Sequence, residues 1–136
     1  MKKAVRNMLI ILAALAFLAT VTVVINPEMR SPRAIRTYIL NRTPLGMSMD
    51  EVIRVIESKK RWGEPVINYQ TGYVSRGPLV PGFPVLRGRS VIGEKSINLI
   101  LGEYTIILET SVEVLWGFDE NSKLIEVEVY KDRDVL

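Results

Sequence analysis

The residues of this chain that could do chemistry are its carboxylates, because histidine and cysteine are both absent. Without these two residue types there is no Ser-His-Asp or Cys-His arrangement for nucleophilic catalysis. The usual ligand sets for zinc and transition metals are missing as well. A cell-wall hydrolase that uses carboxylates stays open as an alternative, although most acidic residues fall on outward strand positions or in turns. We therefore expect a protein that is not an enzyme and that uses no cofactor and no metal.

One acidic stretch, DENSKLIE, has the composition of a calcium loop. Asp119 and Asn121 fit the first and third ligand positions of such a loop. However, Lys123 occupies the fifth position, Leu124 stands where glycine is required, and Tyr130 stands where the bidentate glutamate belongs. The stretch is therefore interpreted as a hairpin turn.

The segment RGPLVPGFPVLRG, residues 76–88, combines prolines with large apolar residues. Its glycines are not followed by a helix, so it is not a phosphate-binding loop. The prolines, spaced by three residues, fit a polyproline II turn. Two interpretations stay open: the segment covers an open part of its own sheet, or it is an exposed contact patch. The candidate contact residues for a partner are Leu79, Val80, Phe83, Val85, Leu86 and Arg87.

Two short helices are expected to precede the strands. Ser31-Pro32 has the residue types of an N-cap and a first helical position, and Pro44 prevents continuation beyond about Leu40. The sequence Ser48-Met49-Asp50-Glu51 is a capping box. The helix that it opens is expected to reach the basic residues 59–61 and to stop at Gly63.

Beyond Pro65 the apolar period changes from 3.6 to 2, which indicates strands. The expected strands are 66–71, 96–101, 104–118 and 124–130, with turns at Gly102-Glu103 and at 119–122. The alternation of apolar and polar residues predicts that the side chains of residues 112, 114, 116 and 118 face the core. The same pattern predicts this for residues 125, 127 and 129. We expect Trp116 in the core and Trp62 as a contact between helix and sheet. The prediction is an α+β fold with two short helices packed on an antiparallel four-stranded sheet.

The N-terminal region contains Met8 to Ile25, eighteen residues without a charge, preceded by Lys2, Lys3 and Arg6. A helix of this length spans about 27 Å, close to the ~30 Å hydrocarbon core of a bilayer. We expect an uncleaved signal anchor at 1–27, with an extracytoplasmic domain at 28–136. A cleavable signal peptide is the alternative, because Ala14-Leu15-Ala16 fits the small-x-small rule of cleavage sites.

Basic and acidic residues are distributed unevenly along the sequence that follows the apolar stretch. Residues 26–89 hold 11 basic and 5 acidic residues, whereas residues 90–136 hold 4 basic and 10 acidic ones. The two halves balance, so no nucleic-acid partner is expected. The cationic half suits a membrane surface with anionic headgroups.

Three short motifs together resemble the SmpA/OmlA-like family. Residues 46–52, GMSMDEV, are similar to the helix start GMS-x-x-x-V of that family, and Gly63-Glu64-Pro65 is similar to the G-x-P that ends the helix. Residues 114–124, VLWGFDENSKL, resemble the late hairpin FD-x-x-G-x-L, with Ser122 where glycine is common. The resemblance implies the fold of β-lactamase inhibitor protein and a small, non-catalytic exported module that binds other proteins at the cell envelope.

The function expected from the sequence is thus a membrane-anchored, extracytoplasmic interaction module with a protein partner. Its membrane contact would be the stretch Met8 to Ile25. A small-ligand-binding domain is the second alternative beside the hydrolase. Such a domain requires a concave pocket of at least about 300 Å³ with converging polar groups.

Overall fold

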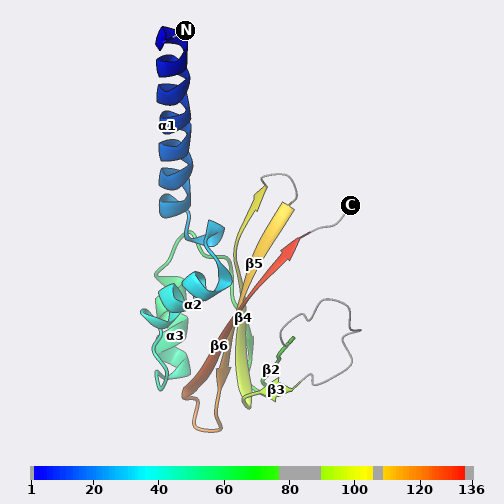
Figure 1. The fold of residues 1–136 in the computed structure, drawn as a ribbon. Helices are drawn as coiled ribbons and strands as arrows, with labels where there is room; N and C mark the ends of the chain where they lie inside the picture. Colours follow the sequence, from blue (N-terminus) through cyan, green and yellow to red (C-terminus); the bar gives the residue numbers. More distant parts are fainter. Residues whose placement is uncertain (1, 77–89, 106–108, 134–136) are drawn as a thin grey trace.

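The computed structural model describes residues 2–76, 90–105 and 109–133 (Figure 1). The helical elements come first in the chain: α1 (Lys2–Ile25), the 3-10 turn η1 (Pro27–Met29), α2 (Pro32–Leu40) and α3 (Met49–Glu57). The strands follow: β1 (Val66–Asn68), β2 (Tyr73–Val74), β3 (Val91–Ile92), β4 (Lys95–Thr105), β5 (Glu109–Phe118) and β6 (Leu124–Arg133). This is the α+β class that the sequence predicts.

Helix α1 projects away from the rest of the fold (Figure 1). Its stretch Lys3–Thr22 is long and apolar enough to cross a membrane, and none of that stretch is buried against the domain. A helix that is apolar on all sides and is not buried against the described part of the domain has the composition of a membrane span. Its length and composition fit a membrane span and also a signal sequence.

The two short helices begin where the capping residues predict. The Ser31 side chain accepts a hydrogen bond from the Ala34 amide, with Pro32 at the first helical position of α2. In α3 the capping box is complete, since Ser48 Oγ accepts from the Glu51 amide and the Glu51 carboxylate accepts from the Ser48 amide. Helix α3 ends at Glu57, so the expected extension through residues 59–61 is wrong.

Four strands form an antiparallel sheet in the order β1-β4-β5-β6. Helices α2 and α3 cover one face of this sheet, which we call the inner face (Figure 1). The opposite face is called the outer face. A separate two-stranded ribbon, β2–β3, pairs Tyr73 with Ile92 and Val74 with Val91. This ribbon is not predicted from the sequence.

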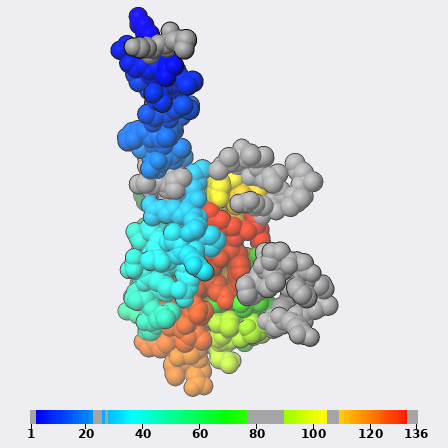
Figure 2. Space-filling view, viewed as in Figure 1, coloured from blue at the N-terminus to red at the C-terminus, as the bar shows by residue number. Residues whose placement is uncertain are grey.

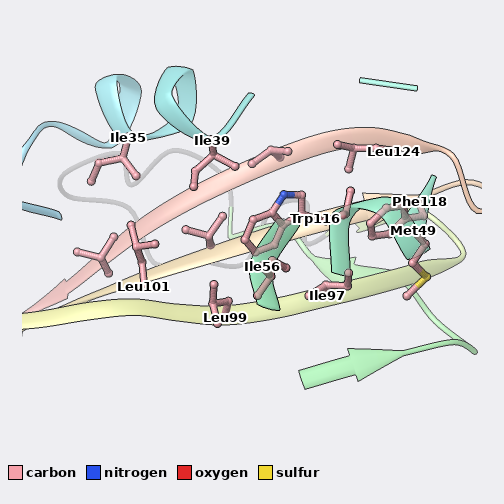
Figure 3. Packing of buried hydrophobic residues seen from close by; sticks show 14 residues of the cluster. Ile35, Ile39, Met49, Ile56, Ile97, Leu99, Leu101, Trp116, Phe118 and Leu124 are labelled. Atoms are coloured by element: carbon pink, nitrogen blue, oxygen red, sulfur yellow. The ribbon is translucent and has the colours of Figure 1, made fainter. Parts of the chain in front are cut away.

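The core lies between the inner face and the two helices (Figure 3). Alternate residues of β5 are fully buried there, as the sequence predicts: Val112, Val114, Trp116 and Phe118. The Trp62 ring lies at the edge of the core with its centroid 6.5 Å from that of Trp116. Trp62 therefore joins the segment after α3 to the sheet, as predicted.

The expected turn at Gly102-Glu103 is wrong. Strand β4 continues through Gly102 to Thr105, with a bulge between Ile100 and Gly102 that keeps pairing with β5. A bulge absorbs one extra residue and bends the strand without ending it. Tyr104 consequently belongs to β4, and β1 is shorter than the expected strand 66–71.

A second bulge overturns the inward assignment of Ile125. The register shifts between Gly117 and Phe118, so that Phe118 pairs with Leu124 and Gly117 pairs with Glu126. Leu124 is therefore the buried residue, whereas Ile125 is 44% exposed. Val127 and Val129 keep their inward positions, fully and partly buried respectively.

Candidate interaction surface

The predicted contact residues lie on residues 77–89, outside the described part of the chain. They are Leu79, Val80, Phe83, Val85, Leu86 and Arg87. The two ends of that segment are described. The Ser75 amide donates to the Ser90 carbonyl oxygen over 2.9 Å, directly beyond the paired β2–β3 ribbon. The segment thus begins and ends at one point of the fold.

The β2–β3 ribbon packs on the outer face of the sheet over Gly117. A Cβ atom placed on Gly117 would lie 2.9 Å from Tyr73 Cε1 and 3.1 Å from Ile92 Cγ2. Only glycine lets the aromatic ring approach the sheet this closely. This covering explains why Gly117 and Leu115 are buried although both are on the outer face.

Arg76 connects the base of the segment to three residues of the sheet. Its guanidinium forms ion pairs of 2.6 Å with Glu113 on β5 and 2.6 Å with Asp132 on β6, and it lies 4.9 Å from the centre of the Tyr130 ring. The hydrogen bond to Asp132 raises the pKa of Arg76 further, against the opposing effect of burial. Two anchors on one cation fix its position far better than a single surface pair would.

Glu128 receives two hydroxyl groups on the same face. Ser75 Oγ donates to its Oε1 over 2.9 Å, and the Tyr130 hydroxyl donates to its Oε2. The Tyr130 oxygen in turn accepts from the Arg76 amide over 2.9 Å. Burial and the bond to Glu128 raise the pKa of Tyr130, which keeps this phenol protonated as a donor.

Two further bonds engage carboxylates of the outer face. Glu126 forms an ion pair of 2.5 Å with Arg36 of α2, and Glu113 accepts a second hydrogen bond from Asn98 over 2.7 Å. Among the described residues, no three carboxylates gather closely enough to hold a metal ion. These acidic groups therefore serve as structural partners of cations, hydroxyls and amides.

Tyr73 has a buried hydroxyl that makes no hydrogen bond in the described part of the molecule. Burial raises its pKa, and the negative charge of Glu128 adds to that effect. An unpartnered buried hydroxyl costs stability.

A groove of about 450 Å³ runs along the outer face beside the ribbon. Apolar Val66, Val74 and Leu115 line it together with polar Asn98 and Glu113. Val66 is 70% exposed, and Ile100 on the same face is half exposed. A face that combines open apolar side chains with saturated polar groups suits contact with another surface.

The DENSKLIE stretch forms the predicted hairpin turn between β5 and β6. The Lys123 amide donates to Asp119 Oδ1 over 2.8 Å, and Ser122 has a φ of +59°, the conformation for which glycine is favoured. Lys95 Nζ donates to Ser122 Oγ over 2.6 Å and to the Glu120 carbonyl over 3.3 Å. A lysine ammonium is thus the cation that this turn binds.

A scan against models of protein families, a search of curated proteins and a search of solved structures each found no match for this chain.

The connection between Arg76, Glu128 and Tyr130 is not predicted from the sequence. A signal for it existed: alternate positions of β6 are polar and aromatic, which marks a polar strand face in need of partners. The partner, however, lies more than fifty positions away along the chain. Only the fold brings these residues together.

Proposed function

We propose that this chain is a membrane-anchored, non-catalytic module whose extracytoplasmic domain binds a protein partner at the cell envelope. Helix α1 would be the anchor, held in the bilayer by the apolar stretch from Met8 to Ile25. The observed two-helix, four-stranded architecture is the one that the resemblance to SmpA/OmlA-like proteins implies. That agreement supports the proposal at the level of fold.

One observation carries the non-catalytic part of the proposal: four carboxylates of the outer face, on β5 and β6, are committed to neighbours. Glu113, Glu126 and Glu128 each accept at least two hydrogen bonds from side chains or backbone amides, and Asp132 pairs with Arg76. A glycosidase needs two carboxyl groups aimed at one substrate position, about 5–9.5 Å apart. Carboxylates that neutralise cations and cap hydroxyls are unsuited to that role, whereas the exposed apolar residues beside them suit a contact.

A small ligand in the outer-face groove is the second candidate function. The observation in its favour is volume, since about 450 Å³ exceeds the ~300 Å³ that such sites require. Against it, the polar groups at its wall, Arg76, Asn98 and Glu113, already bond to one another. A ligand would have to break those bonds before making its own.

The proposal is tested by crosslinking in intact cells that carry the full-length chain. We expect the chain in the membrane fraction at its full 15.4 kDa, digested by protease added outside the cell, and joined by the crosslinker to a second protein. The double variant Leu79→Asp, Phe83→Asp tests the contact residues predicted from the sequence, with Ile125→Asp on the exposed bulge as its matched control. Unchanged partner recovery from the double variant would remove the segment 77–89 from the proposal, and recovery of the uncrosslinked chain alone would refute the proposal itself.

A further inference from the structure

Strand β6 is an outer strand of the sheet, and part of its free edge has been closed by side chains. The Val127 amide donates to Glu126 Oε1 over 2.9 Å, and the Val127 carbonyl accepts from Arg36 Nε over 2.7 Å. Both backbone groups of Val127 therefore point away from β5. Arg36 and Glu126, joined by their own ion pair, occupy the positions that a neighbouring strand would take.

The same alternation leaves the next edge positions open. In an antiparallel strand, every second residue directs its N–H and C=O to the same side, so Val129 and Lys131 share the orientation of Val127. Glu128 and Tyr130 turn theirs toward β5, with which they pair. Within the described part of the chain, no strand pairs with β6 on its free side.

A groove of about 520 Å³ runs beside this open edge. Val127 and Val129 are at its base, Pro32 and Arg33 of α2 form one wall, and Ser75 and Tyr130 form the other. Figure 2 shows β6, in orange and red, at the surface beside α2 in cyan. An added strand needs about 4.8 Å of lateral space and contacts on both faces, and a groove with two walls provides them.

The charges beside the edge define the chemistry of the occupant. On the outer face β6 presents Glu126, Glu128 and Asp132, and on the helix side Arg33 is an exposed cation whose side chain makes no ion pair with a described residue. A second copy of β6 laid antiparallel along the edge would bring acidic residues opposite acidic residues, which is unfavourable. A segment of another protein is favoured if its side chains over the outer face are polar and its side chains toward α2 are apolar, with an acidic residue near Arg33.

We infer that the free edge of β6 at Val129 and Lys131 binds an extended segment of a partner protein as an additional strand. The inference rests on the proposed function and specifies its surface: backbone hydrogen bonds supply affinity, and the groove walls select the side chains. The Arg36–Glu126 pair ends the available edge at Val127. Natural sheets protect open edges against unwanted pairing in this manner, and here the protection stops short of Val129.

The test places a photo-crosslinking residue at position 33, beside the edge, in the full-length chain in intact cells. Position 66 on β1, at the opposite edge of the sheet, is the comparison site because it is highly exposed and lines the outer-face groove. We expect a crosslink from position 33 to a second protein. The crosslinked site should lie in an extended segment of that protein in which apolar and polar side chains alternate. The substitution Val129→Pro removes an edge N–H without removing a bond to β5, and it should abolish that crosslink.

Amide hydrogen exchange provides a readout that does not depend on the proline variant. A synthetic peptide of the crosslinked segment, added to the full chain in detergent, should slow exchange at Val129 and Lys131 roughly tenfold and leave Val66 unchanged. Crosslinking from position 66 alone would overturn the β6 assignment and leave the proposed function standing. A crosslink to a second copy of the chain, full yield from a folded Val129→Pro variant, or unaltered exchange would likewise overturn it. No crosslink from either position would count against both proposals.

Discussion

The indole Nε1–H of Trp116 donates a hydrogen bond to Oγ1 of Thr43 across the buried interior, over 3.1 Å. Both side chains are fully buried. Thr43 follows α2, and its hydroxyl donates in turn to the Ile39 carbonyl over 3.0 Å. This short chain of bonds connects the end of α2 to the central strand β5 and satisfies the one polar atom of the largest core side chain.

Replacing Thr43 by valine should therefore destabilise the domain by about 1–3 kcal/mol, because the indole N–H would remain buried without a partner. Thr43→Ser keeps the hydroxyl and should cost less. Urea unfolding of the full chain in detergent, followed by tryptophan fluorescence, measures both variants. Equal stabilities for the valine and serine variants would show that the hydrogen bond contributes nothing.

Gly117→Ala should destabilise by about 1–3 kcal/mol, since the new methyl would collide with the Tyr73 ring and with Ile92. Gly102→Ala is the matched control in the same sheet, because a Cβ there meets only the flexible Glu28 side chain at 3.6 Å. Thermal unfolding monitored by circular dichroism should show a lower Tm for the first variant and not for the second. A normal Tm for Gly117→Ala would place the β2–β3 ribbon elsewhere.

Tyr73→Phe should raise stability by about 1 kcal/mol, because it removes a buried hydroxyl without a partner and keeps the ring over Gly117. Tyr73→Ala, which loses the ring as well, should destabilise by about 3–5 kcal/mol. The difference between the two variants in urea unfolding isolates the contribution of the ring. Destabilisation by the phenylalanine variant would mean that the hydroxyl has a partner after all.

The capping box predicts an acid dependence. Hydrogen bonds from the side chain and the amide of Ser48 lower the pKa of Glu51. A carboxylate whose folded pKa lies below its unfolded value of about 4.3 stabilises the fold above that value, and the contribution disappears as the pH falls through the folded pKa. Stability should therefore fall on acidification below about pH 4.5, and Glu51→Gln should reduce that decline. Parallel pH profiles for the two proteins would contradict the assignment.

The parts of the fold that were predicted correctly are those whose cause is local. The capping box of Ser48 and Glu51 and the turn at Asp119 depend on residues three or four positions apart, and both appear as expected. Alternation likewise identified the inward face of β5. Strong local signals of this kind specify where an element begins and which side it buries.

The errors in the sheet come from causes that are distant in sequence. The bulge in β6 buries Leu124 and exposes Ile125, and it depends on the pairing of β6 with Gly117 and Phe118 of β5. The short β2–β3 ribbon depends on the space that Gly117 leaves for the Tyr73 ring. A strand of two residues is too short to show the alternation of apolar and polar residues by which a strand is predicted. The free edge of β6 could not be predicted from the sequence either. The order of strands in the sheet decides which strand has an unpaired side.

The charge on the wall of the β6 groove offers the most direct test of the central claim, that this domain binds a protein at that edge. Arg33→Glu reverses an exposed cation that bears no structural ion pair within the described residues, and Lys60→Glu makes the same change at an exposed position after α3. Partner recovery after crosslinking in intact cells should fall about fivefold for Arg33→Glu, the equivalent of about 1 kcal/mol for one partly exposed charge contact, and stay unchanged for Lys60→Glu. Equal recovery from the two variants would contradict the account.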